Sequence, residues 1–109
     1  MAEFEDFIKL DIRAGEVKRA EFFSKARKPA FKLWIDFGEK MGIKRSSARI
    51  TELYNKKELI GRQVLAVVNF PPKQIAQFMS EVLVLGVYTE DGVVLVRPDE
   101  RVDNGSKLG

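Results

Sequence analysis

The stretch that decides the fold is Val68-Asn69-Phe70-Pro71-Pro72-Lys73-Gln74-Ile75-Ala76-Gln77-Phe78-Met79-Ser80-Glu81-Val82-Leu83-Val84-Leu85-Gly86. It joins two apolar, β-branched runs, residues 64–70 and 82–88, and each is short enough to be a buried strand. Because proline cannot donate a ladder hydrogen bond, the Pro71-Pro72 pair must end the first strand. The residues that follow suit one helical turn, in which Ile75 and Phe78 share a face.

Ending the strand at Pro71 places Asn69 and Lys73 at the rim of whatever the strands enclose. Together with Ile75 and Phe78 they give the rim an amide, an ammonium group and two apolar side chains, a set suited to holding a ligand. The pattern alone favours a plainer alternative, in which Ile75 and Phe78 cover the core and Lys73 is solvated.

The rest of the chain predicts an all-β domain with two short helices. Five principal strands with a helix between the third and fourth are the order of an OB-fold, a small Greek-key barrel. An SH3-like barrel is the alternative, but it predicts no helix at that place. The expected strands are 11–23 (with a bulge or bend at Gly15), 31–37, 43–50, 63–70 and 81–88, with a hairpin turn at 90–92 and a return strand at 93–97; the expected helices are 3–10 and 51–59, the latter capped by Thr51.

Apolar alternation predicts which side chains face the core. Apolar side chains in residues 31–37 alternate strictly with Lys32, Trp34 and Asp36, which therefore face outward. The expected inward residues are Phe31, Leu33, Ile35, Phe37, Val64, Ala66, Val68, Leu83 and Leu85. The exposed Trp34 either stacks on a base or an aromatic peptide side chain, or packs under the basic loop 24–29 or in a subunit interface.

Composition predicts a single domain, residues 1–109, that binds rather than catalyses. The chain has no Cys and no His, which excludes the usual triads, thiol chemistry and zinc sites. No Gly-rich phosphate loop or dinucleotide fingerprint is present, so we expect no cofactor. The acidic N-terminus is unlike a secretory signal and no apolar run is long enough to cross a bilayer, so we expect a cytoplasmic protein.

Basic residues are concentrated in one third of the chain. Residues 18–49 contain ten basic and three acidic residues, a net charge of +7, whereas the whole chain carries +3. Such a segment attracts phosphates or acidic peptides, although a charge run is more often just a soluble surface.

Several motifs, in order, resemble the tRNA-binding-domain family of OB-folds. They are residues 7–15 (Phe-Ile-Lys-Leu-Asp-Ile-Arg-Ala-Gly) and the long stretch 68–86. Residues 32–38, 42–48 and 80–86 are most similar to the CsaA branch of that family, the export-related chaperones. The resemblance covers residues 4–109 and implies the same OB-fold.

The resemblance implies two functions. The first is a chaperone that binds unfolded preproteins or peptides in protein export. The second, alternative function is a structure-specific tRNA-binding protein. The expected peptide-binding residues are Asn69, Phe70, Pro71, Lys73, Ile75, Phe78 and Ser80; the expected nucleic-acid-binding residues are Lys32, Trp34, Lys44, Arg45, Arg49, Asn69, Lys73 and Ser80.

Departures from the family pattern favour peptide binding over tRNA binding. Where tRNA-binding members commonly carry a basic residue and Met, this chain has Gln74 and Ile75, and it has Val82-Leu83 in place of Gly-Met. Fewer basic groups and more branched apolar surface suit a peptide better, while the basic segment keeps tRNA binding open.

The resemblance also implies a homodimer. Phe4, Phe7 and Ile8 would share one face of the first helix, and burying them in a subunit interface would contribute several kcal/mol, at about 1.5–3 kcal/mol per side chain. The alternative is that this helix plugs the open end of its own barrel and leaves residues 99–109 loosely attached.

Overall fold

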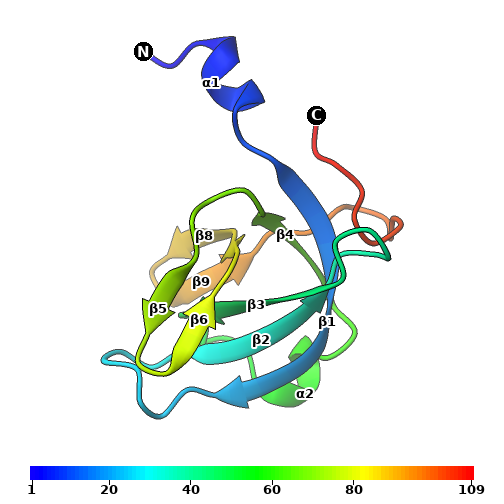
Figure 1. Ribbon diagram of the computed structural model, residues 1–109. Helices are drawn as coiled ribbons and strands as arrows, with labels where there is room; N and C mark the ends of the chain where they lie inside the picture. Colours follow the sequence, from blue (N-terminus) through cyan, green and yellow to red (C-terminus); the bar gives the residue numbers. More distant parts are fainter.

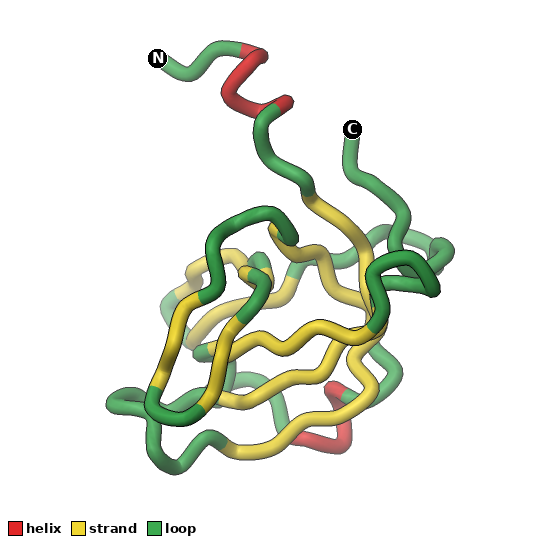
Figure 2. The backbone as a smooth tube through the Cα atoms, in the orientation of Figure 1, coloured by secondary structure: helices red, strands yellow, loops and turns green.

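The protein is a small barrel of antiparallel strands from which the N-terminal helix projects. The computed structural model describes residues 1–109 (Figures 1 and 2). In chain order the elements are α1 (Phe4–Ile8), β1 (Ile12–Phe22), β2 (Phe31–Asp36), β3 (Ile43–Ala48), α2 (Lys56–Leu59), β4 (Gln63–Val67), β5 (Lys73–Ile75), β6 (Phe78–Ser80), β7 (Leu83–Val84), β8 (Gly86–Thr89) and β9 (Gly92–Leu95).

Five strands form the barrel sheet in the order β3-β2-β1-β4-β7, and β5-β6 and β8-β9 are separate hairpins. The two edges of the sheet approach each other because the amides of Glu81 and Val82 both donate to the carbonyl oxygen of Arg45. The barrel is therefore nearly closed, with α2 between β3 and β4. The predicted all-β OB-fold with two short helices is confirmed.

The long strand β1 serves two neighbours. Its first half pairs with β4 and its second half with β2, and the register shifts between Val17 and Arg19. The bulge expected at Gly15 therefore lies a few residues later. Gly15 has a different role: a Cβ there would lie 2.6 Å from Cγ2 of Ile35, so the absence of a side chain lets β1 cross the core.

The main core lies inside the barrel. Leu33, Ile35 and Phe37 of the second strand region pack with Val64 and Ala66 of β4, as the alternation predicts. A second cluster covers the outer face of β4 through Leu65 and Val67, which explains why all five residues of β4 are buried.

The predicted inward register of residues 81–88 is wrong by one residue. Val82 is buried and Val84 packs against the main core, whereas Leu83 is 47% exposed. The bonds to Arg45 direct Val82 into the barrel, so alternation turns Leu83 outward. Leu85 then packs in the second cluster on the outer face of β4, and Val68 is only partly buried.

The helix expected at residues 51–59 is shorter and has a different cap. It begins after Asn55, whose side chain accepts a hydrogen bond from the amide of Glu58, while the Glu58 side chain accepts one from the amide of Asn55. This reciprocal pair is a complete capping box, and Thr51 lies in the preceding turn.

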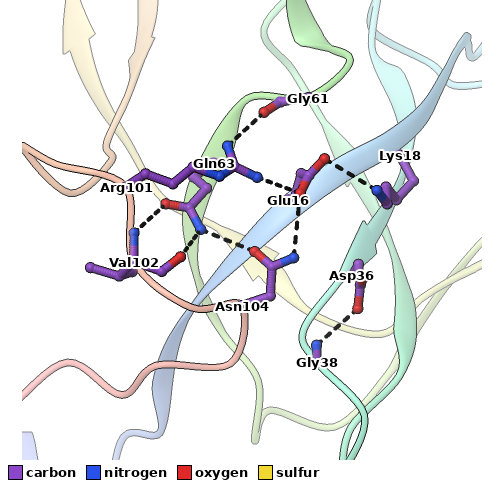
Figure 3. A network of polar contacts seen from close by, with 9 residues as sticks. All are labelled: Glu16, Lys18, Asp36, Gly38, Gly61, Gln63, Arg101, Val102 and Asn104. Atoms are coloured by element: carbon purple, nitrogen blue, oxygen red, sulfur yellow. Dashed lines mark hydrogen bonds and ion pairs between the residues drawn. The ribbon is translucent and has the colours of Figure 1, made fainter.

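The C-terminal segment is held firmly against β1 and β4 (Figure 3). The side chain of Gln63 donates to the carbonyl of Val102 at 2.6 Å and accepts from its amide at 3.1 Å, and Arg101 forms an ion pair with Glu16. Residues 105–108 also pair with the first half of β1. The loosely attached tail that the barrel-plug alternative implied is therefore not observed, because buried backbone and amide groups in β1 and β4 need these partners.

The N-terminal helix covers nothing in this chain. Phe4 is 72% and Ile8 59% exposed, and no residue of α1 is buried. Figures 1 and 2 show the helix standing away from the barrel, so it does not plug the barrel end. No helix in the structure is long and apolar enough to cross a membrane.

Candidate binding groove

The segment after Pro71-Pro72 is a β-hairpin, not a helical turn. β5 and β6 pair antiparallel around a tight turn at Ala76, whose φ is +51°. Ile75 and Phe78 still share a face, because they are cross-strand partners. The hairpin forms because Phe78 has an aromatic surface to pack on, a tertiary contact that overrides the local helical pattern.

Phe78 is the centre of an aromatic cluster on the outer face of β2 and β3. Its ring lies 5.5 Å from that of Phe23 and 5.8 Å from that of Trp34, both edge to face. The ammonium of Lys32 and the guanidinium of Arg45 cover it at 5.5 and 5.6 Å. Phe78 is therefore only 5% exposed and is not free to line a groove.

The aromatic cluster also engages Trp34 and its neighbouring cations. Arg19 stacks 4.4 Å from the centre of the Trp34 ring, and Arg45 forms an ion pair with Glu81 at 3.4 Å. Trp34 thus packs within its own chain, which favours the packing interpretation over a free stacking platform.

A basic cavity of about 570 Å³ lies beside the aromatic cluster. It is bounded by the loop between β1 and β2, the end of β3 and the β5-β6 hairpin; Figure 1 shows the loop and the hairpin tip at the same side of the barrel. Its charged lining is entirely basic, namely Lys25, Arg27, Lys28, Arg49 and Lys73.

A second cavity, of about 530 Å³, continues from the first and is mostly apolar. The two cavities share Lys28, Ser47, Arg49, Lys73 and Ile75. Its remaining lining comes chiefly from residues 82–86 and the β8-β9 hairpin, including Val84, Tyr88 and Val93. We call the two cavities together the binding groove, with a basic half and an apolar half.

Four of the predicted site residues meet in the groove: Arg49, Lys73, Ile75 and Ser80. The hydroxyl of Ser80 also accepts a hydrogen bond from the amide of Ser47 at 3.0 Å, which joins β6 to β3. The groove is therefore supported by the residues that also close the barrel.

The other predicted site residues lie elsewhere. Lys32, Trp34 and Arg45 surround Phe78, and Lys44 pairs with Ile35 on the other side of the sheet. Phe70 and Pro71 are exposed in the β4-β5 loop, outside both cavities.

Asn69 is already engaged by the N-terminal segment. Its amide oxygen accepts from the amide of Asp11 at 2.9 Å, and its amide nitrogen donates to the carbonyl of Lys9 at 2.8 Å. These bonds fix the point where α1 leaves the barrel, so this side chain acts as a clasp within the chain.

Sequence reasoning missed Lys25, Arg27 and Lys28 as site residues, and also the apolar half. The signal for the three cations was present in the +7 charge of residues 18–49. The apolar half could not be predicted, because the pattern of residues 82–85 is that of a buried strand in the core. No group of three or more acidic, His or Cys side chains could hold a metal ion.

The fold and groove define an OB-fold binding domain, and the model of the family described as "Putative tRNA binding domain" matches residues 12–107. The chain belongs to this family. Among solved structures it is similar to the CsaA chaperone protein of Picrophilus torridus, with 54% identity, a TM-score of 0.96 and full coverage of both chains.

Two further relatives extend the comparison. The structure of chaperone CsaA from Bacillus anthracis is 55% identical, with a TM-score of 0.93, and the match covers 100% of this chain and 99% of that one. The methionine–tRNA ligase of Methanococcoides burtonii is 35% identical over 104 residues, which are 94% of this chain and 15% of the ligase. The chain thus spans a small part of the curated relatives it matches.

Proposed function

We propose that this chain is a CsaA-like molecular chaperone, which binds unfolded preproteins or peptides in the binding groove and also has tRNA-binding capacity. The observation that carries the proposal is the groove itself, where free cations adjoin an apolar surface. An unfolded polypeptide presents both apolar side chains and charged groups, so it is matched by both halves.

The comparisons support the chaperone role and the tRNA-binding capacity. Two similar structures of full coverage are described as chaperones. The matching family is named for tRNA binding, and the ligase relatives share this domain alone. Because the ligases extend far beyond the matched region, we propose a binding role without catalysis.

The alternative is a structure-specific tRNA-binding protein with no chaperone role. The observation that favours it is the concentration of five cations in one cavity. Neutralising phosphates with about five cations would give a salt dependence with a log–log slope of about −3.5 to −4.5.

We further propose that the protein is a cytoplasmic homodimer, which delivers clients to the export machinery. The exposed apolar face of α1 supports the dimer, since none of Phe4, Phe7 and Ile8 is buried in this chain. A second copy would cover this face in an isologous interface. Sedimentation equilibrium of the full chain and of a Phe4→Ser/Ile8→Ser variant tests it: a single-chain mass for the full chain would refute the dimer.

The test of function is suppression of aggregation. A chemically denatured client protein is diluted into buffer with and without this protein, and light scattering is followed at low and high salt. If the protein is a chaperone, we expect it to reduce light scattering at both low and high salt, because salt does not screen the burial of apolar surface. Binding of tRNA with no effect on scattering would support the alternative function instead.

A further inference from the structure

The cations of the basic half are available to a ligand. The ion pairs of the chain involve Arg13, Lys18, Arg19, Arg45 and Arg101, and none of these lines the groove. The five groove cations therefore have no acidic partner. Their mutual repulsion in one cavity is relieved when a ligand supplies negative charge.

The apolar half lies directly beside this charge. Lys28, Arg49 and Lys73 border both cavities, so a ligand leaving the basic half enters a lining of Val82, Val84 and their neighbours. Tyr88 stands at this lining and is 90% exposed, which leaves its ring free to cover an apolar side chain. Glu52 is the only acidic side chain in the lining.

This arrangement suits a polypeptide better than a nucleic acid. Single-stranded nucleic acids bind through a basic track interleaved with free aromatic rings. Here Trp34 and Phe78 pack on each other and under cations, and Tyr88 is the one aromatic in the groove. A run of branched aliphatic side chains offers no stacking surface, but it does bury aliphatic and aromatic peptide side chains.

We propose that the groove selects polypeptide segments in which a cluster of acidic residues is followed or preceded by an apolar run, the acidic cluster lying in the basic half and the apolar run in the apolar half. This inference rests on the proposed chaperone function and names its substrate class. It makes the juxtaposition of charge and apolar side chains, rather than apolar character alone, the basis of client choice.

Fluorescence anisotropy with four labelled peptides of equal length tests the proposal. One peptide joins an acidic block to an apolar block; in the others the acids become Lys, the acids become Ser, or the apolar residues become Ser. We expect the acidic–apolar peptide to bind about tenfold more tightly than the Ser-for-acid peptide, and the Lys peptide to bind least. Equal affinities for the acidic and Lys peptides would overturn the proposal.

Variants assign each block to its half of the groove. Lys25→Gln/Arg27→Gln should reduce the preference for acids and leave the Ser-for-acid peptide unaffected, whereas Tyr88→Ser should weaken the binding of both peptides. Lys57→Gln on α2 is the matched control, because Lys57 is exposed and lines neither cavity. If these groove variants weakened tRNA binding without changing peptide affinity, the groove would be an RNA site and the proposal would fail.

The same experiment separates this inference from the proposed function. If the protein suppresses client aggregation but the acidic block has no effect on peptide affinity, the inference alone fails. If neither peptides nor a denatured client bind, the chaperone function fails with it.

Discussion

Two neighbouring surfaces, the outer face of β2 and β3 and the groove beside it, differ in whether their basic side chains have partners. On the outer face, Lys32 and Arg45 lie over the buried ring of Phe78, and Arg45 is also paired with Glu81. In the groove, Arg49 and Lys73 have no such partner. A cation held by a ring and a carboxylate stabilises the fold, whereas an unpaired cation in a cavity is available to a ligand.

This difference shows that the position of a basic residue on the OB-fold does not by itself indicate whether the residue binds a ligand. The face formed by strands 2 and 3 is where this fold commonly binds oligonucleotides and sugars. Here the β5-β6 hairpin packs on that face through Phe78 and covers part of it. The two cavities of the groove lie beside that face, toward the loop at residues 24–29 and the β8-β9 hairpin.

The largest effect is expected from removing the centre of the aromatic cluster. Phe78→Ala should lower the free energy of unfolding by about 3–5 kcal/mol, because a fully buried ring leaves a cavity. Urea unfolding followed by the fluorescence of Trp34 measures it. The control Tyr88→Ala should change stability by less than about 0.5 kcal/mol, since that ring is exposed. A loss below about 1 kcal/mol for Phe78→Ala would contradict a closed, packed outer face.

Charge reversal in the groove should alter tRNA binding next most strongly. Arg49→Glu/Lys73→Glu removes two unpaired cations, so the log–log salt slope should become shallower by about 2 and the affinity should fall at low salt. Filter binding at several salt concentrations measures both. The control Lys56→Glu/Lys57→Glu makes the same change of net charge on α2, and a loss as large as that of the groove variant would show that only overall charge matters.

A smaller effect is expected at the clasp. Asn69→Ala removes the two hydrogen bonds to the N-terminal segment and should cost about 1 kcal/mol, with faster hydrogen exchange at the amide of Asp11. Asn69→Asp keeps the acceptor but not the donor and should be intermediate. Peptide affinity should be unchanged in both; a large loss of affinity with normal exchange would make Asn69 a ligand contact instead.

The smallest effect on stability is expected at Glu16, which forms an ion pair with Arg101 far from the groove. Burial raises the pKa of the Glu16 carboxyl, but hydrogen bonds from Lys18 and Asn104 and the charges of Lys18 and Arg101 outweigh it, so the pKa lies below its ordinary value of 4.5. A carboxyl with a lowered pKa stabilises the fold above the unfolded value, and this contribution is lost as pH falls through the folded pKa.

Glu16→Gln should therefore be less stable than the parent protein at pH 7, and the difference should shrink as the pH falls below about 4.5. Thermal unfolding at several pH values follows this difference. A gap that stays constant down to strongly acidic pH would show that the carboxylate charge contributes nothing. Ligand binding should be unaffected at pH 7.

The barrel was predictable because apolar and polar residues alternate strictly around Leu33 and Ile35, and because Pro71-Pro72 clearly marks the end of a strand. The hairpin at residues 73–80 was not, because its stability comes from the contact of Phe78 with Phe23 and Trp34, which lie far away in sequence. Lys73 and Ile75 were predicted as candidate site residues because both follow the point where β4 ends, at the rim of the barrel.

The groove as a whole was less predictable than its members. It depends on five separate segments, namely the loop at 24–29, the end of β3, the β5-β6 hairpin, residues 82–85 and the β8-β9 hairpin, which only the fold brings together. Local patterns indicate that each segment is basic or apolar, but they carry no information about which segments become neighbours. The sequence pattern predicted Leu83 in the core, one residue out of register, so the apolar half of the groove was not recognised.

The central claim is that ligands bind in the groove and not on the outer face of β2 and β3. The most direct test is a titration of the isotope-labelled protein with the acidic–apolar peptide, followed by backbone amide chemical shifts. We expect the changes to concentrate at residues 25–28, Arg49, residues 73–75, residues 82–85 and Tyr88. Changes concentrated at Lys32, Trp34 and Arg45, with the groove residues unmoved, would contradict the account.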